Sequence, residues 1–196
     1  MDQMEIRQLV ARQRAYFQSG ATLPARARVE ALRALRSAVA AREEELNDAL
    51  RADLGKSAFE SYMCEVGMVL SELTYMIRRT PAFAADRRVR TPLAQFAARS
   101  YVKPSPYGTV LIMSPWNYPL LLTLDPLIDA LAAGNTAVVK PSAYSPATSR
   151  VIARLLAECF PPEHVSVVTG GRQENACLLE QKFDFIFFTG SQAVGR

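Results

Sequence analysis

The chain has 196 residues, of which 49% are hydrophobic and 21% are charged, and its formal net charge is +4. At roughly 150 residues per domain, this length predicts a single domain, and the composition excludes intrinsic disorder and a collagen-like repeat. The small basic excess is densest at residues 78–79 and 87–90, which lack the aromatic residues or the motif that base recognition needs. We therefore expect no nucleic-acid partner.

The cysteines and the N-terminal residues indicate a reducing compartment. Cys64, Cys159 and Cys177 are widely spaced and form no CxxC pair, so neither a disulfide framework nor a metal site is expected. Asp2 and Glu5 stand where a secretory signal would need apolar residues, and no run approaches the roughly 18 apolar residues of a membrane span. The prediction is a cytoplasmic protein with no bound metal and no membrane span.

Residues 1–80 predict a helical segment. A short first helix ends at Gly20, and a long amphipathic helix follows over residues 24–53. The third helix carries an apolar seam with steps of three and four residues, which suits packing against a neighbouring helix. The seam consists of Phe59, Met63, Val66, Leu70, Leu73 and Ile77. Cys64 and Glu65 lie outside it.

An extended connector is predicted over residues 81–107, where prolines recur. Beyond it, four short apolar runs occupy residues 109–113, 136–140, 165–168 and 185–188. Helices are predicted between them over residues 120–133, 146–158 and 173–181. Each run is almost entirely apolar and lacks the alternating polar residues of a strand with one solvent-exposed face, so all four are predicted to be buried parallel strands. The fold class is therefore α/β, a Rossmann-like doubly wound parallel sheet with an N-terminal helical segment.

Specific residues mark the boundaries of two of these helices. Gly134 closes the helix over residues 120–133, in which Pro126 either makes a kink or marks the true first position. Ser145 is predicted to cap the next helix, with Pro146 at its first position.

Ligands of an open α/β sheet bind beyond the carboxyl ends of the strands, and four segments occupy those positions. They are SPWNYP at residues 114–119, KPS at 140–142, Gly-Gly at 170–171 and TGSQAVG at 189–195. Taken in this order, they resemble the aldehyde dehydrogenase superfamily, most closely its class 3 group of fatty and aromatic aldehyde dehydrogenases. The resemblance covers essentially the whole chain. It implies oxidation of an aldehyde to the carboxylic acid by NAD(P)+ through a cysteine thioester.

Asn117 is the candidate catalytic residue. Its amide has two donors and no titratable charge, so it can stabilise a developing oxyanion without acting as a base. The resemblance implies this role for Asn117 at the tetrahedral thiohemiacetal. The alternative from the sequence alone is that Asn117 caps the helix that begins near Pro119.

Lys140 is the first candidate for cofactor binding, because an ammonium at the end of an apolar strand needs an anion or hydroxyls as partners. The alternative is a lysine that extends to solvent at the end of its strand. The resemblance places Lys140, and less strongly Ser142, at the adenosine ribose. Many family members have Glu where this chain has Ala143, a change that removes a charge repelling a 2′-phosphate. The expected cofactor is NAD or NADP.

Gly190 and Gly195 bracket a predicted helix start whose free N–H groups suit a pyrophosphate. Ser191 either caps that helix or donates to the phosphate. The resemblance implies further cofactor contacts by Met113, Ser114, Trp116, Gly170, Phe188 and Val194.

The other polar candidates favour structural roles. His164 is predicted to be a solvated loop histidine, and Cys159 and Cys177 to be buried, inert thiols on helices. The cysteines of the chain do not match the nucleophile of the family.

The family carries its nucleophilic cysteine in a GQ-x-C segment and its general base in an ELGG segment, and neither occurs in residues 1–196. We therefore expect the chain to be the N-terminal part of an NAD(P)-binding domain, without the catalytic domain and inactive alone. The alternative is a non-catalytic nucleotide-binding or interaction fragment of the same fold. The resemblance also implies a homodimer of the full-length enzyme, with the connector over residues 87–107 at the dimer contacts.

Overall fold

The computed structural model describes residues 1–193 and 195. Its helices are α1 (Gln3–Gln18), α2 (Ala25–Ala41), α3 (Glu43–Leu54), α4 (Ala58–Ser61), α5 (Gly67–Phe83), α6 (Leu121–Ala133), α7 (Pro146–Cys159) and α8 (Arg172–Leu179). A π-helical turn (Tyr62–Val66) joins α4 to α5, and a 3-10 turn (Leu93–Gln95) lies between the first two strands. The strands are β1 (Arg87–Val89), β2 (Ser100–Val102), β3 (Thr109–Met113), β4 (Thr136–Lys140), β5 (Val165–Val167) and β6 (Phe185–Phe188).

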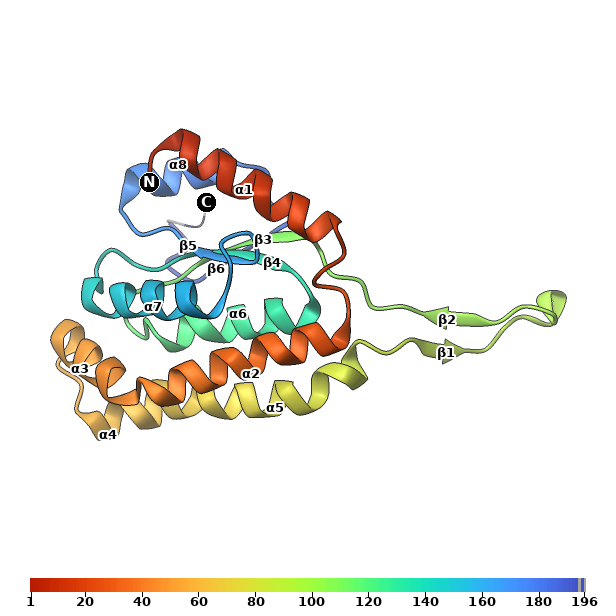
Figure 1. Cartoon of the computed structure of the whole chain (residues 1–196), viewed down its shortest axis with the longest axis horizontal. Coiled ribbons are helices and arrows are strands. Elements are labelled where there is room, and N and C mark those ends of the chain that lie inside the picture. The colour runs from red at the N-terminus through yellow and green to blue at the C-terminus, as the bar shows by residue number, and fades with distance from the viewer. Residues whose placement is uncertain (194, 196) are drawn as a thin grey trace.

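Four parallel strands form the central sheet in the order β5-β4-β3-β6. Helices α1 and α8 cover one face, and α6 and α7 cover the other (Figure 1). Helices α2 and α5 form a further layer against α6 (Figure 1). Because helices lie on both faces, the sheet is doubly wound, and the predicted α/β fold class is confirmed.

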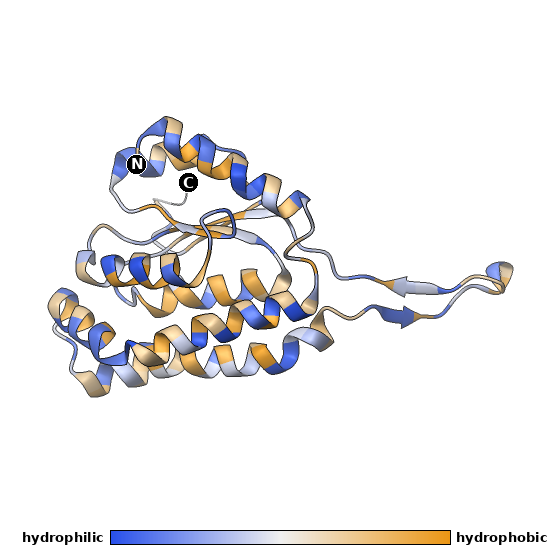
Figure 2. Ribbon diagram, in the orientation of Figure 1, coloured by the Kyte–Doolittle hydropathy of each residue, from blue (hydrophilic) through white to orange (hydrophobic). Residues whose placement is uncertain are grey.

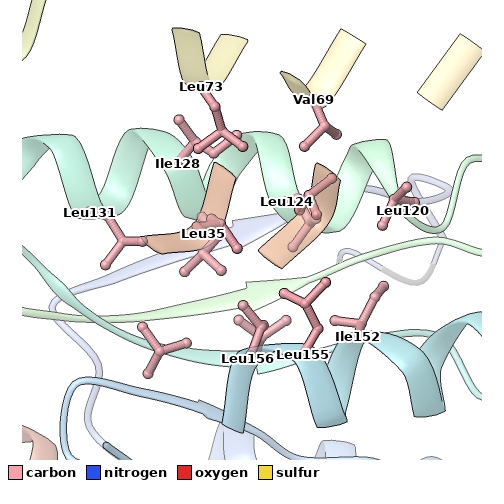
Figure 3. Packing of buried hydrophobic residues seen from close by; sticks show 14 of the residues in the cluster. Leu35, Val69, Leu73, Leu120, Leu124, Ile128, Leu131, Ile152, Leu155 and Leu156 are labelled. Atoms are coloured by element: carbon pink, nitrogen blue, oxygen red, sulfur yellow. The ribbon is translucent and has the colours of Figure 1, made fainter. Parts of the chain in front are cut away.

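The main hydrophobic core lies between the sheet, α6, α7 and the helical layer. Figure 3 shows Val69 and Leu73 of α5 directed toward α6, whose Leu124 and Ile128 belong to the same core. A smaller core joins Ile6 and Leu9 of α1 to the opposite face of the sheet. Figure 2 shows that the apolar residues of these helices gather on the faces turned toward their neighbours. Among residues 1–193 and 195, no helix combines the length and the apolar character needed to cross a membrane.

The long helix predicted over residues 24–53 is in fact two helices, α2 and α3, which separate at Arg42. The Arg42 backbone leaves the helical region, with φ −117° and ψ 22°. Its side chain forms ion pairs with Glu158 of α7 and with Glu45. As a result α3 packs against α7, whereas α2 packs mainly against α5 and α6. Tertiary contacts have therefore overridden a continuous local helical pattern.

The predicted seam of the third helix is wrong at its N-terminal end. Phe59 and Met63 are 77% and 56% exposed, whereas Val66 and Leu73 are fully buried. The π-helical turn explains the difference, because its one extra residue rotates the preceding residues, Phe59 among them, about the helix axis relative to α5. The remaining seam residues, Leu70 and Ile77, are half-buried and pack against the main core.

The region predicted as an extended connector, residues 81–107, contains the two short strands β1 and β2, a 3-10 turn and the end of α5, which continues to Phe83 with Pro81 in its last turn. Strands β1 and β2 pair in an antiparallel arm that projects from the body (Figure 1). Leu93 and Phe96 at the end of the arm are 88% and 86% exposed.

The prediction of four buried strands fails for β6. This strand pairs with β3 on one side only in the described sheet, and its side chains are 37–44% exposed. The other edge strand, β5, is covered by α7, whereas β6 packs mainly against β3 and so keeps its side chains partly exposed.

Candidate functional site

A cavity of about 360 Å³ opens at the carboxyl ends of β3, β4 and β6. Most of the predicted cofactor residues line it, and they come from all four segments that follow the strands. These lining residues are Met113, Ser114, Trp116, Lys140, Ser142, Gly170, Phe188, Gly190 and Ser191. The structure therefore brings together residues that are up to 78 positions apart in the sequence.

The register of the sheet explains this convergence. Met113, the last residue of β3, is paired with Lys140 on one side and with Phe188 on the other. Beyond the strands, the Ser114 N–H donates to Lys140 O (3.2 Å) and the Thr189 N–H donates to Met113 O (3.1 Å). The three strand ends thus lie side by side, as the rule for ligand sites in parallel sheets requires.

Three predicted site residues are not among those that line the cavity. Asn117 is exposed and follows Trp116 directly in the turn beside the cavity. Gly195 lies against the Phe188 ring, where an added Cβ would be 3.0 Å from a ring carbon. Val194 lies outside the described residues.

The predicted helix start at Ser191 is absent from the described residues, which form a turn at 192–193. The Gly195 N–H donates to Ser191 O (3.1 Å), which is the backbone hydrogen bond found across this turn between residues that the structure describes. One hydrogen-bonded turn is an unfavourable helix nucleus, because it fixes several residues for one bond.

Lys140 is 4% exposed, so it does not extend to solvent from its strand end. Its Nζ donates to Pro141 O (2.8 Å). Burial lowers the pKa of the ammonium, and the charge of nearby Glu174 partly opposes that shift. Because an ammonium has three donors, Lys140 can hold a ligand hydroxyl as well as the carbonyl.

The charges around the cavity favour an anionic ligand. Lys140 and Arg172 both line it, and no Asp or Glu is found among the lining residues that the structure describes. The nearby Glu174 carboxylate accepts from the Gly171 N–H and partly offsets the positive charge. Ala143, which carries no charge, also lines the cavity. Sequence reasoning missed Arg172, although it directly follows the Gly-Gly turn.

Gly170 adopts φ +138°, and a Cβ there would lie 2.4 Å from Glu174 Oε2. The Gly171 N–H donates to the same carboxylate (2.7 Å). Hydrogen bonds from the backbone of Glu174 and Gly171 lower the pKa of Glu174. The Gly-Gly turn therefore depends on a glycine at position 170 for a structural reason as well as for access to the cavity.

The alternative role of Asn117 as a helix cap is wrong, because the N-cap position of α6 makes no side-chain cap hydrogen bond. The Glu65 carboxylate accepts from the first N–H groups of the helix, those of Leu120 (2.8 Å) and Leu121 (3.1 Å). Lys56 Nζ pairs with Glu65 Oε1 at 2.5 Å and also donates to Asn117 O at 3.3 Å. The sequence signal for Glu65 was an acidic residue within an apolar stretch.

The predicted cap of α7 is also replaced. Ser145 makes no side-chain cap hydrogen bond, and its Oγ has no partner among the described residues. The Asp53 carboxylate accepts from the N–H groups of Ala147 (3.0 Å) and Thr148 (2.7 Å). Pro146 does occupy the first helical position, as predicted.

His164 is half-buried, which corrects its prediction as a solvated residue. Its ring lies 5.5 Å from the Phe160 ring and 5.6 Å from the Tyr16 ring. Burial lowers the pKa of the imidazole to about 4. Cys159 and Cys177 are half-buried free thiols, and burial raises the pKa of Cys159.

Comparison with known proteins gives the family. The model of the aldehyde dehydrogenase family matches residues 1–196. The 4,4'-diaponeurosporen-aldehyde dehydrogenase of Staphylococcus aureus is 41% identical over 93% of this chain and 40% of its own length. Aldehyde dehydrogenase family 3 member A2 of Mus musculus is 42% identical over 95% of this chain and 39% of its own length.

A solved structure extends the comparison to three dimensions. The substrate-bound structure of Staphylococcus aureus AldH superposes with a TM-score of 0.95 at 40% identity, covering 100% of this chain and 42% of that one. This chain thus spans about 40% of the length of the relatives that it matches. The match over its whole length establishes that it belongs to the aldehyde dehydrogenase family.

Proposed function

We propose that this chain supplies the dinucleotide site and the oxyanion donor of an enzyme that oxidises an aldehyde to the carboxylic acid. The observation that carries the proposal is the convergence of three strand ends on one cavity that contains a buried ammonium, Lys140. When bound, NAD(P)+ would accept a hydride from the substrate. Neither the GQ-x-C nor the ELGG segment occurs in the 196 residues, so the nucleophile and the base lie elsewhere in the active enzyme.

The residues of the cavity fit a dinucleotide. Lys140 and Ser142 present donors that suit the hydroxyls of the adenosine ribose, and Arg172 adds a second positive charge. Met113, Trp116 and Phe188 line the cavity with apolar surface, which suits flat rings. Gly170 and Gly190 have no side chain, so a ligand can approach the backbone closely.

The cavity also supports a cofactor preference. A carboxylate at the ribose selects NAD+ by accepting from the 2′-hydroxyl, whereas an arginine accommodates the 2′-phosphate of NADP+. In this chain, Ala143 stands where such a carboxylate would be, so that acceptor is missing, and Arg172 lies within the same cavity. The proposed enzyme therefore accepts NADP+ and prefers it to NAD+.

Asn117 is proposed as the catalytic residue of this chain. Its side-chain amide forms no hydrogen bond with the residues described in the structure, so its two donors are not committed to the fold there. We propose that this amide donates to the oxyanion that develops when a thiolate adds to the aldehyde. The chain alone lacks the thiolate and is expected to be inactive.

Two further features support a homodimer and a cytoplasmic location of the proposed enzyme. The exposed apolar residues of the β1–β2 arm, among them Leu93 and Phe96, suit a contact between two copies, in line with a homodimer of the full-length protein. The free thiols of Cys64, Cys159 and Cys177 suit the reducing cytoplasm.

The test uses the full-length gene product with a series of aldehydes and both dinucleotides. Asn117→Ala should lower kcat by roughly 10²- to 10³-fold, because one oxyanion donor is lost, while the Kd of the dinucleotide stays within about twofold. Gln8→Ala, which removes an exposed side-chain amide on α1 outside the cavity, is the control and should retain kcat. A wild-type protein that reduces neither dinucleotide, or an Asn117→Ala variant with unchanged kcat, would refute the proposal.

A further inference from the structure

A buried ion pair lies behind the turn that carries Asn117. Glu65 is fully buried and Lys56 is 8% exposed, and their charged atoms are 2.5 Å apart. Lys56 lies in the loop between α3 and α4, and Glu65 lies in the π-helical turn. The pair therefore belongs to the helical segment and not to the sheet that forms the cavity.

The two charges hold opposite ends of the same short turn. Lys56 Nζ donates to Asn117 O (3.3 Å), where the turn begins. Glu65 Oε2 accepts from the N–H groups of Leu120 and Leu121, where the turn passes into α6. The negative charge also suits the positive end of the α6 dipole. Residues 117–120 are thus clamped between a cation and an anion that neutralise each other.

Tyr118 adds a further contact to this clamp. The ammonium of Lys56 lies 4.2 Å from the centroid of the Tyr118 ring, a favourable distance for a cation over an aromatic face. Lys56 therefore contacts both Asn117 and the residue that follows it. This arrangement restricts the backbone that directly follows the Asn117 side chain.

The π-helical turn is what brings Glu65 into this position. The Gly67 N–H donates to Tyr62 O, the hydrogen bond that defines the turn. An added Cβ at Gly67 would lie 2.7 Å from that same oxygen, so the close approach depends on glycine. Turns of this kind occur frequently at functional sites. Without the extra residue, the regular seam would direct Glu65 away from the core, as the sequence pattern predicts.

We propose that Lys56 and Glu65 are positioning residues for Asn117, fixing its backbone so that the amide meets the developing oxyanion. The inference rests on the proposed function of Asn117. A displacement of about 1 Å in a positioned group can cost roughly 10²-fold in rate, so a rigid turn has a large kinetic value. The pair contacts backbone atoms of the turn and the Tyr118 ring, and its effect on the reaction is exerted through Asn117.

A double-mutant cycle in the full-length protein tests the inference. Lys56→Met should lower kcat by roughly 10²-fold, while the Kd of the dinucleotide and the KM of the aldehyde stay within about threefold. In an Asn117→Ala background, the same substitution should lower kcat by less than about threefold more. Full multiplication of the two effects, or a Lys56→Met variant with unchanged kcat, would overturn the inference.

Arg28→Met is the matched control for losing a buried cation. Arg28 is also 8% exposed, and it donates to the carbonyls of Thr22, Leu23 and Ala132, away from the cavity. This variant should lose stability and keep its kcat. Where Lys56→Met fails to fold, Glu65→Gln provides the same test, because its amide oxygen still accepts from Leu120 and Leu121 while the ion pair is lost.

Hydrogen exchange provides a measurement that does not depend on activity. The amides of Leu120 and Leu121 should exchange at least about tenfold faster in Lys56→Met than in Arg28→Met, because their acceptor is no longer held. Unchanged exchange in an active enzyme would overturn the positioning role and leave the proposed function standing. An inactive wild-type protein would instead overturn the proposed function and the inference with it.

Discussion

The helices α6 and α7 begin in similar ways and differ in what surrounds their first turns. Each follows a strand that ends at the cavity, and each is capped by a carboxylate from the helical segment. The cap of α6 is Glu65, which is fully buried and paired with Lys56. The cap of α7 is Asp53, which is half-buried and takes part in no ion pair among the residues that the structure describes.

This difference shows how burial decides which partners a cap needs. A carboxylate that water cannot reach must be neutralised, whereas a half-buried one can rely on the helix N–H groups and on solvent. Both caps come from a segment that sequence reasoning treated as an N-terminal addition to the sheet. The helical segment instead fixes the two turns that border the cavity.

Removing the cation from the buried cap should have the largest effect on stability. Lys56→Met leaves Glu65 buried without a counter-charge and should lower the free energy of unfolding by about 3–5 kcal/mol. Urea denaturation of the full-length protein measures this loss. A loss below about 1 kcal/mol would mean that the two caps are equivalent, and the comparison would fail.

A charge placed in the α7 turn should alter cofactor choice more than stability. Ala143→Glu adds a carboxylate to the cavity wall, which should repel a 2′-phosphate and shift the Kd ratio toward NAD+ by roughly tenfold or more. Titration calorimetry with both dinucleotides measures the ratio. Arg172→Gln is the companion variant and should weaken only NADP+ binding, and an unchanged ratio in both would contradict the proposed preference.

Loss of the half-buried cap, Asp53, should have a smaller effect. Asp53→Ala removes the acceptor for two α7 N–H groups that water can partly replace, so the expected loss is about 0.5–2 kcal/mol. The same denaturation measurement applies. A loss equal to that of Lys56→Met would show that burial does not separate the caps.

A third carboxylate, Asp125, sharpens the comparison because it lies in the interior of α6, caps no helix end and pairs with no cation among residues 1–193 and 195. Burial, with the charges of Glu72 and Asp129, raises its pKa from 3.8 to about 6. A carboxyl whose pKa is higher in the folded state than in the unfolded state stabilises the fold at pH values below its unfolded-state pKa. This stabilisation is lost as the pH rises through the folded-state pKa. Asp125→Asn should therefore stabilise the protein at about pH 8 by roughly 1 kcal/mol, after allowance for partial exposure.

The pH dependence provides the control for this variant. The gain from Asp125→Asn should shrink as pH falls from about 7 toward 4, because the native carboxyl then becomes neutral as well. Thermal unfolding across this pH range measures the gain. A gain that does not change with pH would indicate a packing effect of the substitution.

The sheet and most of the cavity could be predicted from the sequence, because they depend on local signals. Short apolar runs bounded by turn residues define the strands, and parallel strands place their carboxyl ends at one edge. Gly134 ended α6 as predicted, in the left-handed conformation that glycine favours. Lys140 was therefore placed at the cavity from its position at the end of an apolar strand, whereas Phe188 was placed there by the resemblance to the family.

The residues that the sequence did not predict depend on tertiary contacts. No Gly or Pro marks the break at Arg42, whose side chain pairs with α7. Glu65 reaches the interior only because a π-helical turn shifts the register, and its partner Lys56 is in a separate loop. Asp53 replaces Ser145 as a cap because α3 packs beside α7. Local patterns carry no information on such pairings.

A crystal structure of the full-length protein with NADP+ bound is the most direct test of the central claim. We expect the adenosine ribose within hydrogen-bond distance of Lys140 Nζ and Ser142, the 2′-phosphate facing Arg172, and the nicotinamide beside Phe188, on the side of the cavity that leads to Asn117. A dinucleotide bound away from the carboxyl ends of β3, β4 and β6 would contradict the account.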